Sequence, residues 1–346
     1  MKHKPHIIAD RDIPFLRGIL EPYATTEYIA GSDISHGDAL RADALIVRTR
    51  TRCDGALLEG TPVSLIATAT IGHDHIDAEW CERHRIEVTT AEGCNARGVL
   101  QYVMAALYAL GRLDEWTPPQ KTLGVVGVGN VGSLIAEYGR LFGFRVLCCD
   151  PPRREADPAF ESLDLPQMLP QCDIVTCHVP LSRDGRHPTL GLAGRDFFAA
   201  IKPGSVFINT SRGKVVSDRA LTDAIQRGQV GRAVIDTWND EPRIDPLLLR
   251  LTTFATSHIA GYTLQGKAAG TAAVVRAASR HFGFPLGSWY PPEVTPSHAD
   301  PSIGWERMGE AMPRYFDIAA ETGRLKTRPE TFEETRNNYD YRTEFF

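Results

Sequence analysis

The stretch Thr122-Leu-Gly-Val-Val-Gly127-Val-Gly129-Asn-Val-Gly132 decides the fold that this sequence predicts. Its apolar first half leads into three glycines spaced as G-x-G-x-x-G, and residues 131–142, which follow, have helical character. A second apolar run, residues 145–150, comes next and ends in Asp150. A strand, a glycine turn, a helix and another strand in this order are typical of a parallel βαβ unit.

The same alternation of short apolar runs and helical segments extends in both directions from this motif. The expected strands are residues 6–9, 27–30, 44–48, 64–69, a short one at 88, 122–127, 145–150, 174–179, 205–209, 233–237 and 253–257. The expected helices include residues 13–20, 77–85, 96–113, 131–142, 194–201, 218–226 and 263–281. Strands joined by helices form parallel sheets covered on both faces. We predict an α/β fold with two doubly wound parallel sheets, a Rossmann-type domain inserted in a flavodoxin-like domain.

The two sheets imply a discontinuous domain organisation. We expect one domain from residues 1–95 together with 259–283, and a second domain from residues 96–258. The texture changes after residue 283, where prolines are frequent and periodicity is weak. Residues 284–346 are therefore expected to form a short C-terminal extension.

Composition narrows the class of protein. Thirty-eight Lys and Arg stand against 43 Asp and Glu, for a net charge of −5, which disfavours a nucleic-acid or membrane-surface protein. No apolar run approaches the roughly 18 residues that a membrane span needs, and the first residues do not resemble a secretory signal. Seven cysteines without a Cys-x-x-Cys pair argue against a disulfide scaffold or structural zinc. We expect a cytoplasmic protein with reduced cysteines.

The glycine turn predicts a dinucleotide site. Gly127 allows the tight turn, Gly129 lets backbone N–H groups approach a pyrophosphate, and Gly132 allows close packing of helix on strand. Asp150 can accept hydrogen bonds from ribose hydroxyls and repel a 2′-phosphate, which favours NAD over NADP, although Arg153 and Arg154 behind it weaken that preference. The residues expected to line this part of the site are Gly127, Gly129, Asn130, Val131, Gly132 and Asp150. The alternative is a plain glycine turn in an ordinary α/β unit.

Three polar residues that follow expected strands form a second pattern. Arg212 follows the strand at 205–209, Glu241 lies shortly after the strand at 233–237, and His258 ends the strand at 253–257. Ligands bind at the carboxyl ends of parallel strands, so the topology brings all three to one edge. Histidine can take a hydroxyl proton as hydride leaves the same carbon, a carboxylate can orient the imidazole, and arginine can hold a substrate carboxylate. Taken singly, each has a structural alternative: a hydrogen-bonding histidine, a turn-capping arginine and a solvated glutamate.

The order Arg, Glu, His after G-x-G-x-x-G resembles the D-2-hydroxyacid dehydrogenase family. Other matching segments are Ala67-Thr-Ala-Thr-Ile-Gly-His-Asp-His-Ile-Asp77, Gly93-Cys-Asn-Ala96, Cys149-Asp-Pro-Pro152 and Thr256-Ser-His-Ile-Ala-Gly-Tyr-Thr-Leu-Gln-Gly-Lys267. The last segment is the most specific. It resembles the members of that family that oxidise 4-phospho-D-erythronate with NAD in the biosynthesis of pyridoxal phosphate. The resemblance covers about residues 5–282 and also implies a homodimer formed through the C-terminal region.

The resemblance implies roles for individual residues. His258 would be the proton donor and acceptor, Glu241 its partner, and Arg212 the ligand of the substrate carboxylate. The implied NAD contacts are Asp150, Val179, Thr210, Ser211, Arg212, Asp236 and Gly261. The implied substrate contacts are Thr49, Thr70 and Tyr262.

A phosphorylated sugar acid carries roughly three negative charges, so its site needs cations beyond Arg212. Residues 47–52 supply Arg48, Arg50 and Arg52 at the end of an expected strand. Strand alternation would put these arginines on one side and Thr49 and Thr51 on the other. We expect Arg48 to contact substrate, whereas Arg52 is as consistent with a solvated surface.

Three alternatives remain open at this point. His73-Asp74-His75 superficially resembles a metal-ligand set, but no further ligands stand at suitable spacing, so no metal is expected. The substrate could be another D-2-hydroxy acid, such as phosphoglycerate or glycerate. A protein that only binds and senses NADH is a third reading, which the complete set of Arg, Glu and His disfavours.

Overall fold

The protein folds into two compact units in the computed structural model, which describes residues 4–297 and 304–345. One unit comprises Met1–Asn95 and Thr263–Pro296, and the other comprises Ala96–Tyr262 and Ser297–Phe346. The expected C-terminal extension, residues 284–346, is not a third body, since its two parts belong to different units.

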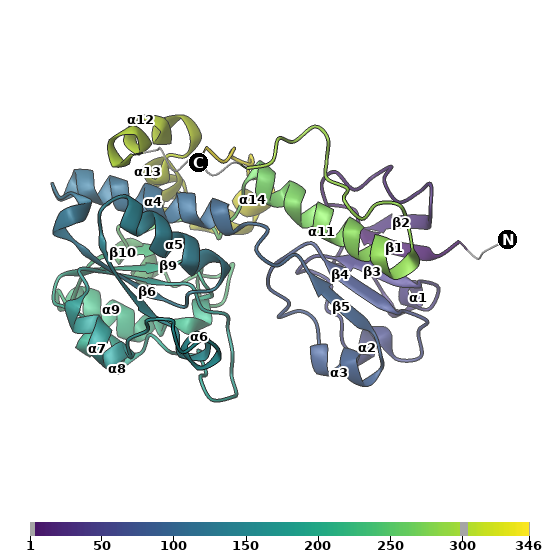
Figure 1. The fold of residues 1–346 in the computed structure, drawn as a ribbon, viewed down its shortest axis with the longest axis horizontal. Helices are drawn as coiled ribbons and strands as arrows, with labels where there is room; N and C mark the ends of the chain where they lie inside the picture. Colours follow the sequence, from purple (N-terminus) through teal and green to yellow (C-terminus); the bar gives the residue numbers. More distant parts are fainter. Residues whose placement is uncertain (1–3, 298–303, 346) are drawn as a thin grey trace. The chain divides into compact units, whose positions relative to one another are not determined.

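The first unit is built on a parallel sheet of five strands (Figure 1). Its strands are β1 (His6–Asp10), β2 (Thr25–Ile29), β3 (Ala44–Val47), β4 (Leu65–Thr68) and β5 (Glu87–Thr90), in the order β2-β1-β3-β4-β5. Its helices are α1 (His36–Ala39), α2 (Gly55–Leu58), α3 (Ala78–Arg83) and α11 (Leu264–Phe282). This strand order is the flavodoxin-like one that we expected.

The connection between β1 and β2 corrects one prediction. Residues 13–20, expected to be helical, form a series of turns instead. Phe15 and Gly18 have φ angles of 62° and 86°, and Pro14 precedes them, so this backbone cannot continue as a helix. The apolar periodicity has another cause, because Leu16 and Leu20 are fully buried in the core of this unit while the chain turns around them.

The second unit carries a parallel sheet of six strands. They are β6 (Thr122–Val126), β7 (Arg145–Cys149), β8 (Ile174–Cys177), β9 (Ser205–Asn209), β10 (Val230–Ile235) and β11 (Phe254–Ala255), in the order β11-β10-β9-β8-β6-β7. Its longer helices are α4 (Ala96–Leu113), α5 (Asn130–Leu141) and α9 (Asp218–Gln226), and its shorter ones are α6 (Pro151–Ala156), α7 (Leu165–Met168), α8 (Arg195–Ala200) and α10 (Pro246–Leu251). The chain places β7 on one side of β6 and β8 on the other, which makes the carboxyl end of β6 a switch point where α/β proteins bind ligands.

The core of the second unit explains why its strands are nearly all apolar. Every residue of β6, β8 and β9 is buried, as expected of parallel strands covered on both faces. Three further helices, α12 (Trp305–Tyr315), α13 (Ile318–Thr327) and α14 (Phe332–Asn337), complete this unit. Their apolar side chains join the two hydrophobic clusters of this unit. Met308 belongs to the cluster that contains α4, and Phe332 belongs to the other cluster.

None of the seven cysteines forms a disulfide, and all but Cys94 are buried. Burial raises the pKa of Cys53, Cys149, Cys172 and Cys177 to about 12, so these thiols behave as small apolar groups. Within the described ranges, no helix combines the length and the apolar character that a membrane span requires.

Candidate active site

The glycine turn after β6 has the geometry of a backbone anion cradle. Gly127 has a φ of 82°, and a Cβ there would lie 2.7 Å from Val179 Cγ1. A Cβ at Gly132 would overlap the Gly127 carbonyl oxygen, whereas a Cβ at Gly129 would meet no atom within 4 Å. Gly127 and Gly132 are thus required by the turn and the packing, and only Gly129 opens onto space. Because Gly129 also caps the N-terminus of α5, the residues present fit a bound pyrophosphate.

Asp150, which follows β7, closes one side of this turn. Its Oδ2 accepts a hydrogen bond from the Val128 N–H at 2.7 Å, and its Oδ1 accepts one from the Arg153 N–H at 3.0 Å. The Arg153 guanidinium donates to the Val128 carbonyl at 2.6 Å and lies over the Phe160 ring. Arg154 is paired with Asp164 at 2.9 Å. Both arginines that weakened the preference for NAD are therefore engaged within the protein, and Asp150 is held at the turn, with a carboxylate that can accept ribose hydroxyls.

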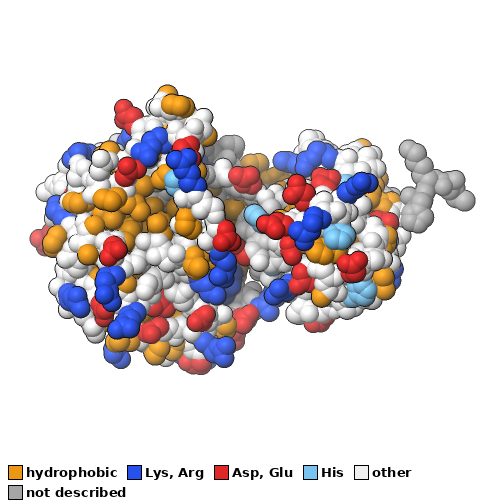
Figure 2. Space-filling model, turned by 90° about the horizontal axis from the view of Figure 1, so that it is seen from below, with side chains coloured by type: hydrophobic (Ala, Val, Ile, Leu, Met, Phe, Trp, Pro, Cys, Tyr) orange, Lys and Arg blue, Asp and Glu red, His pale blue; other side chains and the backbone are white. Residues whose placement is uncertain are grey.

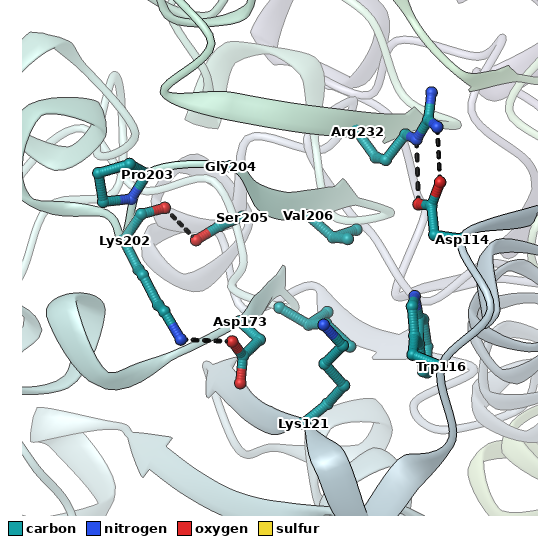
Figure 3. Close-up of a pocket in the computed structure, with 11 residues that line it drawn as sticks. Asp114, Trp116, Lys121, Asp173, Lys202, Pro203, Gly204, Ser205, Val206 and Arg232 are labelled. Atoms are coloured by element: carbon teal, nitrogen blue, oxygen red, sulfur yellow. Dashed lines mark hydrogen bonds and ion pairs between the residues drawn. The ribbon is translucent and has the colours of Figure 1, made fainter.

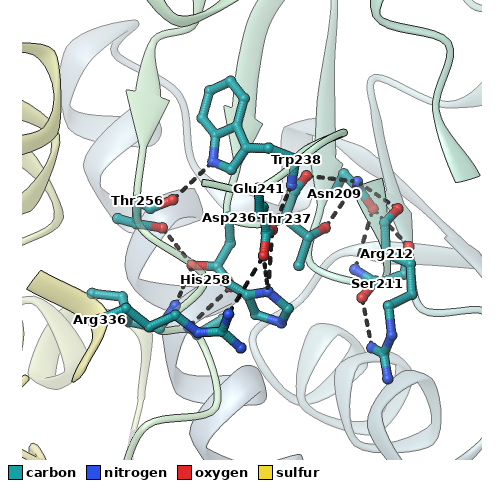
Figure 4. A network of polar contacts seen from close by, with 12 residues as sticks. Asn209, Ser211, Arg212, Asp236, Thr237, Trp238, Glu241, Thr256, His258 and Arg336 are labelled. Carbon is teal, nitrogen blue, oxygen red and sulfur yellow. Dashed lines mark hydrogen bonds and ion pairs between the residues drawn. The ribbon is translucent and has the colours of Figure 1, made fainter. Parts of the chain in front are cut away.

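His258 and Glu241 form a hydrogen-bonded pair at the carboxyl ends of the strands (Figure 4). The His258 Nδ1 lies 2.8 Å from one carboxylate oxygen of Glu241 and 3.1 Å from the other. Since an ionised carboxylate only accepts, Nδ1 carries the hydrogen, and Nε2 is the ring nitrogen that can exchange a proton with a substrate. Both side chains are partly exposed, 26% for His258 and 18% for Glu241, so a ligand can reach them.

Glu241 is ionised at neutral pH. Burial alone raises its pKa, but the hydrogen bond and charge of His258, the Trp238 N–H at 2.9 Å and the nearby Arg336 outweigh burial and lower the pKa below its usual value. The pair is thus a carboxylate beside an imidazole, the arrangement that orients a general base and stabilises its protonated form.

Asp236, at the end of β10, holds the backbone behind His258. It is 1% exposed and accepts hydrogen bonds from the Thr256 hydroxyl at 2.6 Å, the Ile259 N–H at 2.8 Å and the Ala260 N–H at 3.0 Å. The Tyr102 hydroxyl, on α4, lies 2.7 Å from the Thr256 hydroxyl. The contacts of Asp236 in the structure are therefore internal, and they fix the loop that includes Gly261 and Tyr262.

Arg212 follows β9 at the same edge of the sheet. Its Nη1 donates to the Ser211 carbonyl at 2.9 Å, and the Asn209 side chain braces the turn by accepting from the Ser211 hydroxyl and donating to Thr237. Thr210 lies beside it, with its hydroxyl 3.2 Å from His178 Nδ1. The structure therefore brings Arg212, Glu241 and His258 to one edge of one sheet, as the spacing predicted (Figure 4).

Arg48 and Thr49 belong to the first unit, where the predicted alternation is wrong. β3 ends at Val47 and residues 48–51 form a turn, so strand periodicity does not apply to them. Thr49 is exposed, but Thr51 is buried and donates to the Gly31 carbonyl. The Arg48 Nε lies 2.9 Å from Asp10.

Arg48 also reaches Asp12, with its Nη2 at 3.0 Å from that carboxylate. The Arg48 guanidinium is therefore paired with two carboxylates at the carboxyl end of β1. Arg50 and Arg52, both exposed, lie on the turn and just after it.

Thr70 and the His73-Asp74-His75 turn lie after β4. The Thr70 hydroxyl is 2.7 Å from the Thr68 hydroxyl and donates to the Gly72 carbonyl at 3.0 Å. His75 Nε2 lies 3.3 Å from Thr68 Oγ1, and burial lowers its pKa to about 4. Across the described part of the chain, no group of three or more His, Cys, Asp or Glu side chains is arranged to hold a metal ion.

A hollow of about 310 Å³ opens elsewhere on the second unit, at the amino ends of its strands (Figure 3). Lys202 pairs with Asp173 at 2.6 Å, and Arg232 pairs with Asp114 at 2.6 Å. Parallel sheets bind ligands at their carboxyl ends, so this hollow is at the edge away from the candidate site.

Comparisons with known proteins agree with this geometry. Residues 108–260 match the family model described as "D-isomer specific 2-hydroxyacid dehydrogenase, NAD binding domain". An erythronate-4-phosphate dehydrogenase from Bacteroides thetaiotaomicron is 41% identical over 340 residues, which are 98% of this chain and 97% of the relative. This chain belongs to the D-2-hydroxyacid dehydrogenase family. A second erythronate-4-phosphate dehydrogenase, from Azotobacter vinelandii, is 42% identical over 281 residues, covering 81% of this chain and 74% of the relative.

Solved structures of D-2-hydroxyacid dehydrogenases share the fold. A crystal structure of D-lactate dehydrogenase from Aquifex aeolicus, complexed with NAD and lactic acid, superposes with a TM-score of 0.66 at 24% identity. It covers 84% of this chain and all of its own length, so about a sixth of this chain has no counterpart in it. The expected α/β class with two parallel sheets is confirmed.

Sequence reasoning missed several residues that build the site. Asn209 could have been found, because it ends β9 as Arg212 follows it. Tyr102 and Thr256 contact each other across 154 positions of sequence, and only the fold reveals that pair. Arg336 carried no signal, since it lies in a polar segment without periodicity.

Proposed function

We propose that this protein oxidises 4-phospho-D-erythronate at C2 with NAD, yielding 3-hydroxy-2-oxo-4-phosphooxybutanoate, as a step of pyridoxal phosphate biosynthesis. The observation that carries the proposal is the His258–Glu241 pair at 2.8 Å, on the sheet whose β6 leads into the open Gly129 turn. Similarity to relatives named erythronate-4-phosphate dehydrogenase over nearly the full chain supports this substrate.

Each residue of the candidate site has a defined part in this reaction. NAD, when bound, supplies the acceptor for the hydride that leaves C2. His258 Nε2 takes the C2 hydroxyl proton, so the two electrons of the C–H bond leave with the hydride while C2 becomes a carbonyl. Glu241 fixes the imidazole and stabilises its protonated form. Arg212 holds the substrate carboxylate with its planar fork, which orients C2.

The binding residues follow from the glycine turn, from the charge of a phosphorylated substrate and from the family resemblance. Gly127, Gly129, Asn130, Val131, Gly132, Asp150, Val179, Thr210, Ser211, Arg212, Asp236 and Gly261 are the proposed NAD contacts. Arg48, Thr49, Thr70 and Tyr262 are the proposed substrate contacts. Asp236 and Arg48 already make the contacts within the protein that are described above. Binding a ligand would therefore be a second role for each of them.

The experiment is a comparison of substrates by NADH absorbance. We expect NADH formation with 4-phospho-D-erythronate at a kcat/KM at least 10-fold above that for 3-phosphoglycerate or glycerate. Replacing His258 with Ala should reduce kcat by a factor of about 10² to 10⁴ while NAD still binds. His84→Ala, at an exposed histidine of the first unit, is the matched control and should retain wild-type turnover.

Two results would redirect the proposal. Preference for phosphoglycerate or glycerate would make the protein another D-2-hydroxyacid dehydrogenase. Tight NADH binding without turnover of any 2-hydroxy acid tested would instead favour a protein that senses the cofactor.

We further propose a homodimer that acts in the cytoplasm. The absence of a disulfide among the seven cysteines supports a reducing compartment. Figure 2 shows hydrophobic side chains gathered on part of the second unit, amid charges of both signs, and apolar surface of this kind favours association. Light scattering after size-exclusion chromatography should give twice the chain mass of 38.2 kDa, and a single-chain mass would refute the dimer.

A further inference from the structure

Arg336 reaches the candidate site from α14, near the end of the chain (Figure 4). Its Nη1 lies 3.6 Å from Glu241 Oε2, the same oxygen that His258 approaches most closely. Its Nε donates a hydrogen bond to the Tyr262 hydroxyl at 3.1 Å. One guanidinium therefore joins the proposed partner of the general base to a proposed substrate contact.

The segment that carries Arg336 is fixed to the loop after His258. Arg342 is 7% exposed and donates through Nη1 to the Ile259 carbonyl at 2.9 Å and the Tyr262 carbonyl at 3.3 Å. Its Nη2 donates to the Gly98 carbonyl at 3.0 Å and also to the Ala260 carbonyl. Since these are backbone contacts in a buried setting, the position of Arg336 is set by the fold of the second unit.

We propose that Arg336 is a positioning residue of the active site. Through Glu241 it acts on the proton affinity of His258, and through its hydrogen bond to Tyr262 it positions a side chain that is a proposed substrate contact. The inference rests on the proposed function. It extends the machinery beyond Arg212, Glu241 and His258 to the C-terminal segment.

The sign of the electrostatic effect follows from the charges around His258. Glu241 lies against the imidazole, and Asp236 lies behind the loop that carries it. Arg336 and Arg212 are the cations in this view (Figure 4). Burial works against the charge of Arg336, but Tyr262 and Glu241 outweigh it and raise the pKa of Arg336, so the guanidinium stays charged.

A fixed positive charge beside Glu241 offsets part of the carboxylate's pull on the imidazole proton. Arg336 therefore weakens the hold of Glu241 on that proton. Because the base must be neutral to accept the hydroxyl proton, Arg336 extends oxidation toward lower pH.

The test compares three full-length variants with the wild type. Arg336→Met removes the charge and Arg336→Lys keeps it without the planar fork. Arg328→Met is the matched control, because Arg328 also meets a glutamate, Glu330, at 3.6 Å in the same C-terminal region, but in an exposed position. The readouts are the pH profiles of kcat and kcat/KM for NADH formation with 4-phospho-D-erythronate.

We expect Arg336→Met to lower kcat by about 10- to 100-fold and to move the midpoint of the rising limb up by about 0.5 to 1 pH unit. Arg336→Lys should restore most of the midpoint shift and only part of kcat, and Arg328→Met should match the wild type. An unmoved midpoint in Arg336→Met overturns the proposal. So does a rise in KM alone, which would make Arg336 a substrate ligand, or an equal loss in Arg328→Met, which would indicate a structural effect.

A second readout does not depend on turnover. In protein labelled at the histidine rings, an NMR titration should show the His258 ring, assigned with His258→Gln, holding its proton to higher pH in Arg336→Met than in the wild type. If the wild type forms no NADH from phosphoerythronate, the proposed function fails while this titration still decides the role of Arg336. If Arg336→Met does not fold, Arg336→Lys decides: a lowered kcat with a retained midpoint supports the proposal, and wild-type kcat refutes it.

Discussion

At the residue scale, His178 shows how a neutral side chain can make the fold sensitive to acid. It follows β8, with Nε2 2.8 Å from the Thr176 hydroxyl and Nδ1 3.2 Å from the Thr210 hydroxyl. Burial lowers its pKa to about 3, against 6.5 for an ordinary histidine. The unfolded chain therefore binds this proton first as the pH falls. The stabilisation is fully present above about pH 6.5 and is lost progressively toward pH 3.

This predicts a pH-dependent difference between two variants. His178→Gln should lose about 1 kcal/mol less stability than the wild type between pH 7 and 5.5, even if it is less stable at pH 7. His84→Gln, at an exposed site, should keep the wild-type decline. The measurement is the Tm of the second unit, which calorimetry gives at each pH. Parallel declines in all three proteins would mean that His178 is not the group that takes up the proton.

The same scale shows what the sequence could and could not predict about the site. Arg212, Glu241 and His258 could be found, because strand ends in a parallel sheet meet at one edge whatever the loops do. Several of their supporting contacts could not, since Tyr102 and Arg336 act through side-chain geometry that no spacing encodes. The internal pairing of Arg48 with Asp10 was hidden for the same reason.

At the scale of the element, the βαβ unit around Gly129 separates folding from binding. Gly132 is required by packing, since a Cβ there would overlap the Gly127 carbonyl oxygen. Gly129 faces open space, so its missing side chain serves an approaching anion rather than the fold.

Two alanine substitutions should therefore have opposite signatures. Gly132→Ala should destabilise the second unit by about 2 kcal/mol or more. Gly129→Ala should leave Tm nearly unchanged and raise the Kd for NAD by at least about 10-fold. Calorimetry and a fluorescence titration with NADH separate the two effects. Unchanged NADH affinity in Gly129→Ala would remove this turn from the cofactor site.

Element prediction failed where local backbone chemistry overrode apolar periodicity. Residues 13–20 keep the spacing of a helix, yet Pro14 and the left-handed Phe15 turn the chain while Leu16 and Leu20 fill the core. The strand β3 stops at Val47 because the next residues form a turn. The long runs, such as α4 and α11, were predicted well, because burial over many turns leaves no alternative.

At the scale of the whole molecule, the C-terminal segment belongs to the core of the second unit. Weak periodicity and many prolines predicted a separate extension, but α12, α13 and α14 each place apolar side chains in the hydrophobic clusters of this unit. Some aromatic residues near the end pack within the chain, since Phe332 is 1% exposed and the Tyr339 ring lies edge-on to the Tyr262 ring. They therefore do not by themselves require a partner.

Phe332, the first residue of α14, tests this placement. It is 1% exposed among buried residues such as Leu325 and Leu249, so Phe332→Ala should destabilise the second unit by about 3 to 5 kcal/mol. Tyr315→Ala, at a side chain 39% exposed, is the matched aromatic control and should cost less than about 1.5 kcal/mol.

NAD should raise the Tm of the affected unit, which identifies its transition by calorimetry. Because α14 also carries Arg336, the Phe332→Ala protein should lose turnover on heating at a lower temperature than the one at which its first unit unfolds. A wild-type Tm in Phe332→Ala would show that the segment contributes nothing to this core, and the separate extension would have to be reconsidered.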